Sequence, residues 1–317
     1  MDVLGGHGLA PWIAFNALVI VLLAFDLGVV NRKAHAIGFR EALFWNIVWT
    51  ALGVAFAAVV FRLYGRQSAL EYLTGYVIER ALSIDNIFVF VIVFSYFRVD
   101  PRYQHRVLFW GILGALVMRG ALIFAGAALV ALFHWVLYLF GAFLVYSGVM
   151  LTLKSTEAPE PERNPVVRLV RRLLPLDTSA EGPHFFVRHG RRLYATPLLI
   201  VLAVVETTDL VFALDSIPAI FGVTQDALII YSSNVFAILG LRAMYFLLAA
   251  MMPRFHFLKH GLSLILVLIG LRMLFDPWID VPTGLTLVVV CAILAGSVGL
   301  SFVVKRPGKD RPDETAR

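Results

Sequence analysis

Cysteine is almost absent from this sequence. Cys291 is the single cysteine among 317 residues, so the chain cannot form an intrachain disulfide or a cluster of thiolate metal ligands. Lysine and arginine are missing from the first 31 residues. A cleaved signal peptide starts with a basic region, and we therefore expect none here.

Charged residues are scarce as well. They make up 15% of the chain against 60% hydrophobic residues, and the mean hydropathy is +0.84. A soluble domain is nearer about a quarter charged and half apolar. The apolar residues come in blocks of about 20, the length that crosses a bilayer as a helix. The sequence predicts an all-α polytopic membrane protein with about nine transmembrane helices, at residues 11–30, 42–61, 69–97, 107–128, 134–153, 197–221, 227–251, 261–276 and 284–304.

The positive charges are distributed unevenly between the loops. Of the 27 Lys and Arg residues, 21 lie in alternate connecting segments and in the tail from Lys305, whereas the opposite loops hold only Arg62 and Arg66. The positive-inside rule then places the N-terminus outside and the C-terminus in the cytoplasm, in a multi-pass protein of the inner or plasma membrane. The net charge of +6 therefore reflects orientation in the lipid bilayer, and we do not expect the protein to bind nucleic acid.

The longest connecting segment, 154–196, is rich in Pro, Glu and Arg. Its "VVRLVRRLL" could form a short basic amphipathic helix on anionic lipid. Length and composition favour a solvated cytoplasmic linker instead. We expect one transmembrane domain over 1–317, with the linker between 69–153 and 197–276, and with the last span and tail in 277–317.

Two of the predicted spans carry acids that should be costly inside a membrane. They contain "ERALSIDNIFVF" and "VETTDLVFALDSIPAIF". Aligning the two places Asp85 on Asp215, Asn86 on Ser216 and Glu79 on Asp209, and each following span carries an arginine, Arg119 and Arg242. The third to fifth spans thus match the sixth to eighth. Because the offset is three crossings, we predict two inverted three-helix repeats, an arrangement typical of transporters with a site near the midplane.

The available ligands favour a hard cation. All eight histidines lie in loops or near span ends, so an intramembrane hydrolase, which usually needs histidine ligands, is not expected. The midplane offers oxygen, which suits Mn²⁺, Ca²⁺ or Mg²⁺. The candidate ligands are Glu79, Asp85, Asn86, Glu206, Asp209 and Asp215, with hydroxyls of Ser83, Thr207, Thr208 and Ser216 nearby.

The alternative for these acids is structural, because ion pairs with Arg80, Arg119, Arg242 and Arg272 could nearly neutralise them. Helical geometry adds a constraint: Asp209 and Asp215 are about 120° apart on an unbroken helix. We expect a kink at Pro218 to bring them together. Asp26, near the inner end of the first span, is a candidate proton relay or first contact for the ion, and it could equally contact water or Arg32.

At "DLGVVNRKAH", "ERALSIDNIFVF" and "VETTDLVFALDSIPAIF" the sequence resembles the TerC/Alx family of integral membrane proteins, which belongs with the LysE-type exporters. The resemblance runs through nearly all nine spans. It implies export of Mn²⁺ from the cytoplasm, with Glu79, Asp85, Glu206, Asp209 and Asp215 as the functional acids.

The resulting prediction is a secondary transporter, not an enzyme. It has Mn²⁺ as its substrate, no prosthetic group and no nucleotide-binding motif, and proton antiport is a plausible source of energy because crowded carboxylates can exchange a metal for protons. The alternatives are an exporter of another hard divalent cation such as Ca²⁺, or a membrane sensor of pH or metal.

Overall fold

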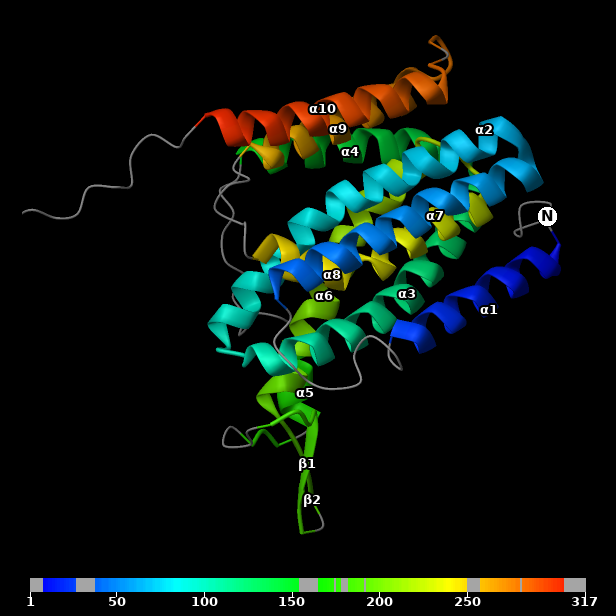
Figure 1. The fold of residues 1–317 in the computed structure, drawn as a ribbon. Coiled ribbons are helices and arrows are strands. Elements are labelled where there is room, and N and C mark those ends of the chain that lie inside the picture. The colour runs from blue at the N-terminus through cyan, green and yellow to red at the C-terminus, as the bar shows by residue number, and fades with distance from the viewer. Residues whose placement is uncertain are drawn as a thin grey trace, which may run out of the picture.

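The computed structural model describes residues 8–26, 38–153, 165–173, 175–177, 182–190, 192–249, 257–279 and 281–304. These residues form an all-helical bundle with one small hairpin (Figure 1). In chain order the elements are α1 (Leu9–Phe25), α2 (Phe39–Tyr96), α3 (Pro101–Leu132), α4 (Val136–Leu153), α5 (Pro165–Leu173), β1 (Phe186–His189), β2 (Arg192–Ala195), α6 (Pro197–Phe221), α7 (Ala227–Leu239), α8 (Leu241–Ala249), α9 (Leu258–Phe275) and α10 (Thr283–Val303).

Within the described residues, six helices are long and apolar enough to cross a membrane, or seven if the bent pair α7–α8 counts as one span. α1 is a shorter apolar helix. The protein is therefore a polytopic helical membrane protein, as predicted. The predicted span 197–221 has the bounds of α6, and the predicted spans 134–153, 227–251, 261–276 and 284–304 match α4, α7–α8, α9 and α10 to within three residues. α3 is longer than the predicted span 107–128, because it begins at Pro101 and ends at Leu132.

α2 contains two of the predicted spans. Its 58 residues would extend about 87 Å as a straight helix, far beyond a hydrocarbon core of about 30 Å. The helix is broken at Gly65, where φ is 88°, a backbone conformation that favours glycine. The two halves run side by side (Figure 1), and Tyr72 of the second half donates a hydrogen bond to the carbonyl of Gly53 in the first, at 2.9 Å.

α7 lies at the centre of the bundle, because all thirteen of its residues are buried. The peripheral helices instead expose large apolar side chains, such as Ile13 (66% exposed), Phe44 (59%) and Val288 (64%). In a membrane protein such surfaces face lipid. In Figure 1, α10 with α4 and α9 lies on one side of the bundle and α1 on the other.

α4 and α9 pack at very short range. A Cβ added to Gly141 would lie 2.9 Å from the carbonyl oxygen of Gly270, and one added to Gly148 would lie 2.8 Å from that of Ser263. The later residue on α4 faces the earlier one on α9, so the helices are antiparallel. Small residues that let two backbones meet are typical of helix contacts in membranes.

The segment 154–196 is more structured than a linker. It contains α5 and the antiparallel hairpin β1–β2, which project from one end of the bundle in Figure 1. The side chain of Val167 is completely buried, and the guanidinium of Arg106 lies 5.4 Å from the ring centre of Phe185. Val167 of α5 is thus packed inside the protein, whereas Val166 and Leu169 of the same helix are exposed, and the assignment of 154–196 as a cytoplasmic linker stays a prediction.

Candidate functional site

A buried polar centre forms where α2, α3 and α6 meet. Arg119 of α3 reaches Asp209 of α6 with two parallel hydrogen bonds, from Nε to Oδ2 at 3.0 Å and from Nη2 to Oδ1 at 2.9 Å. Its Nη1 bonds Glu79 of α2 and lies 3.2 Å from the hydroxyl of Ser216. Asn86 donates from Nδ2 to Asp209 Oδ1 at 3.0 Å. Sequence segments more than 100 residues apart thus build one network.

The centre is fully enclosed by protein. None of Glu79, Asn86, Arg119, Asp209 and Ser216 is more than 3% exposed. Charges this deep must be paired and hydrogen-bonded, or the cost of removing them from water is not recovered. One guanidinium against two carboxylates leaves one negative charge when all three groups are ionised.

Several oxygens beside this network have no partner. Glu79 Oε2, Ser83 Oγ and Asn86 Oδ1 are buried and make no hydrogen bond within the described part of the chain. The three residues are spaced at i, i+4 and i+7 on α2, so they lie within about 60° on one face. Three unsatisfied oxygens on one face next to Asp209 are the features expected of an oxygen-ligand cation site.

Ser83 was identified as a nearby hydroxyl from the sequence but not singled out as a candidate. Its spacing of four residues from Glu79 is the signal that could have found it. The other nearby hydroxyls are used locally, because Thr207 and Thr208 donate to the carbonyls of Ala203 and Val204, at 2.6 and 2.7 Å.

Glu206 lies one helical turn from this centre, toward the end of the bundle that carries α5 and the hairpin. Its side chain covers Gly114 of α3, where an added Cβ would collide with the carboxylate. Its Oε2 is buried and has no hydrogen-bond partner among the residues described. Glu206 is also close enough to Asp209 for their charges to interact.

Asp85 and Asp215 belong to a second group. Asp215 accepts a hydrogen bond from Ser147 of α4 at 2.7 Å, and Asp85 interacts electrostatically with Lys259 and with Asp215. α6 continues as one helix through Pro218 to Phe221, and a kink at Pro218 stays a prediction. An unbroken α6 directs Asp209 and Asp215 to different neighbours, since they are about 120° apart.

The five acids therefore do not share one cage. Across the described ranges, no group of three or more His, Cys, Asp or Glu side chains is arranged to hold a metal ion. The assignment of Glu79, Asp85, Asn86, Glu206, Asp209 and Asp215 as ligands remains a prediction.

The other predicted charge partner lies elsewhere. Arg242 pairs with Asp26 at the end of α1, with both side chains at least nine-tenths buried. Arg242 does not contact the acids at the centre. Arg32, the other contact that the sequence suggested for Asp26, lies outside the described residues. Arg80 bonds Asn46 and Thr50, at 2.6 and 2.8 Å. The alternative in which the acids form structural ion pairs with arginine therefore fits Glu79 and Asp209, which both pair with Arg119 among the described residues.

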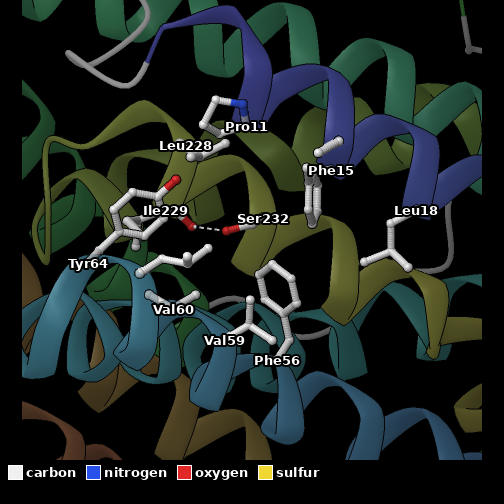
Figure 2. A pocket seen from close by; sticks show the side chains of 12 residues that line it. Pro11, Phe15, Leu18, Phe56, Val59, Val60, Tyr64, Leu228, Ile229 and Ser232 are labelled. Atoms are coloured by element: carbon white, nitrogen blue, oxygen red, sulfur yellow. Dashed lines mark hydrogen bonds between the residues drawn. The ribbon is translucent and has the colours of Figure 1, made fainter.

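An apolar cavity of about 220 Å³ lies between α1, the first half of α2 and α7 (Figure 2). Phe15, Phe56 and Leu228 are among its lining residues, and the hydroxyl of Ser232 is already donated to the carbonyl of Ile229 at 3.2 Å. A metal ion needs oxygen, nitrogen or sulfur ligands. This cavity is therefore not a candidate ion site.

Comparison with known proteins agrees with a membrane protein of this kind. A family model described as "Integral membrane protein TerC family" matches residues 64–309. An uncharacterized membrane protein of Myxococcus xanthus is 48% identical over 303 residues, covering 95% of this chain and 94% of its own.

Two further relatives span nearly the same length. The "Putative membrane-bound redox modulator Alx" of Salmonella typhi is 46% identical over 292 residues, covering 89% of this chain and 91% of its own. An uncharacterized membrane protein of Rickettsia bellii is 39% identical over 294 residues, covering 93% and 97%. No solved structure matches. On the family match and these identities, this chain belongs to the TerC family of integral membrane proteins.

Proposed function

We propose that this protein is a secondary transporter that exports a hard divalent cation, with Mn²⁺ as the first choice, from the cytoplasm. One observation carries the proposal: Glu79 Oε2, Ser83 Oγ and Asn86 Oδ1 are buried, unpartnered and next to Asp209. Polar atoms at this depth are costly unless something binds them. A cation that prefers oxygen ligands satisfies all of them at once.

The charge of the centre suits a divalent ion. Glu79 and Asp209 together carry two negative charges when ionised, which would balance the charge of Mn²⁺ once Arg119 no longer pairs with them. Carboxylate, amide and hydroxyl oxygens favour Mn²⁺, Mg²⁺ and Ca²⁺ over Zn²⁺ and copper, which prefer histidine and cysteine. Ca²⁺ is the alternative substrate.

The proposed topology has nine crossings, with the N-terminus outside and the C-terminus in the cytoplasm of the inner or plasma membrane. The break of α2 at Gly65 supports counting its halves as two crossings. The charge distribution supports the orientation, since α5 and the hairpin belong to the arginine-rich segment 154–196.

Two sets of contacts support the proposed inverted repeats. Asn86 donates to Asp209, and their proposed equivalents Ser216 and Glu79 both accept from Nη1 of Arg119. The proposed equivalents α4 and α9 pack antiparallel, with Gly148 and Gly270 both at close contacts. Alternating access would then arise as one repeat rocks against the other about a central site.

We further propose that the protein is a carrier and not an enzyme, with the metal ion and lipid as its partners and no prosthetic group. Proton antiport is the proposed energy source, since several buried carboxylates can exchange a metal ion for protons. Some relatives are named as putative redox modulators. Cys291, the single cysteine, cannot form a dithiol within this chain, so we favour ion transport.

The test is Mn²⁺ flux in proteoliposomes that contain the purified full-length protein, with and without a pH gradient. Flux that depends on the protein supports a carrier, whereas binding without flux indicates a sensor. Ser83→Ala should reduce the flux several-fold because it removes one oxygen from the site. Ser232→Ala, in the apolar cavity, is the matched control and should leave the flux unchanged. Equal effects of the two variants would remove Ser83 from the site.

A further inference from the structure

Arg119 lies where a bound cation would have to bind. Its guanidinium makes the two-pronged contact with Asp209 and also reaches Glu79. These are the two acids of the proposed ion site, and their geometry with Arg119 is the strong, charge-assisted form of hydrogen bonding. The unpartnered oxygens of α2 adjoin this contact. Metal and guanidinium therefore need the same carboxylates.

We propose that Arg119 is a built-in cation that competes with the transported metal for Glu79 and Asp209, and that Glu206 receives it when the metal binds. The proposal rests on the function proposed above. Arg119 and a divalent ion cannot share the two acids without a net positive charge in a buried site, so binding of one displaces the other.

Glu206 is placed to accept the displaced guanidinium. Its carboxylate has an oxygen without a hydrogen bond, and it lies over Gly114, five residues before Arg119 on α3. Glu206 also lies three residues before Asp209 on α6, about 60° around the helix axis, so the acid that Arg119 contacts and the acid that would receive it share one face of α6. The missing Cβ at Gly114 leaves the space that the Glu206 carboxylate occupies.

This exchange gives the transporter two states that differ in the partner of Arg119. Without metal, Arg119 partly neutralises Glu79 and Asp209 while Glu206 is unpaired. With metal, the ion takes Glu79, Asp209 and the α2 oxygens, and Arg119 pairs with Glu206. A ligand shifts a conformational equilibrium only by its differential affinity for the two states, and here that difference is the change of partner of Arg119.

The experiment measures Mn²⁺ affinity by titration calorimetry on the full-length protein in nanodiscs. Arg119→Gln removes the competing cation and should tighten Mn²⁺ binding at least roughly tenfold while slowing export, because the metal is then released poorly. Arg242→Gln is the matched control, an arginine on the corresponding span of the other repeat that pairs with Asp26. It should leave the Mn²⁺ affinity unchanged.

Glu206→Gln tests the second half of the exchange. With Arg119 present it should weaken Mn²⁺ binding roughly tenfold, since the guanidinium loses its alternative partner. In the Arg119→Gln background it should have no further effect. A loss of equal size in both backgrounds would make Glu206 a direct ligand and overturn the exchange.

The remaining outcomes are also decisive. Folded Arg119→Gln that binds Mn²⁺ no better than the wild type would make Arg119 a structural ion-pair residue only. Should that variant not fold, Arg119→Lys takes its place, because it keeps the charge but loses the two-pronged contact with Asp209: tighter Mn²⁺ binding supports the competition, and an unchanged affinity overturns it. A wild-type protein that neither binds nor transports Mn²⁺ or Ca²⁺ would instead refute the proposed function itself.

Discussion

Arg119 and Arg242 lie on corresponding spans of the two proposed repeats, yet they have different partners. Arg119 lies between two acids from two helices at the centre of the bundle. Arg242 pairs with Asp26 at the end of α1, outside both repeats. An arginine on corresponding spans thus belongs to a candidate ion site in one repeat, whereas in the other it forms an ion pair that links α8 to the end of α1.

The difference arises from the neighbours. The α3 arginine meets Asp209 because α6 packs directly against α3, as the contact of Gly111 with Val205 indicates. Arg242 is the second residue of the short helix α8, which follows a bend of 43° at Gly240, and Asp26 at the end of α1 is its acid. An internal duplication therefore need not preserve the use of each copy of a residue.

The largest effect is expected from Asp209→Asn, which removes the acid that Arg119 grips with two hydrogen bonds. We expect export to fall at least roughly 100-fold, because charge-assisted bonds are lost and Arg119 is left partly unpaired. Manganese content of cells that depend on this exporter is the measurement. Asp226→Asn, which affects the cap of α7, is the control, and normal manganese content in Asp209→Asn would exclude this residue from the site.

A smaller effect, on stability, is expected at the other arginine. Asp26→Asn should lower the free energy of unfolding by about 3 kcal/mol, because it leaves a buried guanidinium without its charge partner. The double variant Asp26→Asn with Arg242→Gln should recover part of this loss. Chemical denaturation in detergent measures both. A double variant less stable than Asp26→Asn alone would show that the pair does not act as a unit.

The α4–α9 contact tests the structural side of the repeat comparison. Gly148→Val should cost about 1–3 kcal/mol, since its side chain would enter the backbone of α9 at Ser263 and overpacking costs about that much. Gly296→Val on α10 is the control, because an added Cβ there meets no described atom within 4 Å. Thermal unfolding should separate the two variants, and similar melting temperatures would contradict the tight packing.

Cysteine labelling should leave function intact and test the orientation. In a Cys291→Ala background, single cysteines at Gln67 and Gln225 should react with an impermeant thiol reagent on intact cells, and cysteines at Gln104 and His184 should not. The expectation follows from the distribution of Lys and Arg. Labelling at 104 or 184 would break the inversion between the repeats, on which the comparison of Arg119 with Arg242 depends.

Much of the architecture is predictable from the sequence alone. Runs of apolar residues predicted the membrane helices, including the bounds of α6, and membrane insertion depends on local hydrophobicity and length. The acids that interrupt these runs were identified for the same reason, because a charge is conspicuous where each neighbour is apolar. Their register predicted that Glu79 and Asp209, or Asp85 and Asp215, belong together.

Only the tertiary structure decided which charges pair. The sequence offered Arg80, Arg119, Arg242 and Arg272 as partners, and the packing of α2, α3 and α6 selected Arg119 for the centre. Pro218 lies inside α6, which continues as one helix to Phe221. Ser83 became a candidate ligand through its unpartnered oxygen. Partner choice depends on distances between helices far apart in the chain, and local hydrophobicity carries no information about those distances.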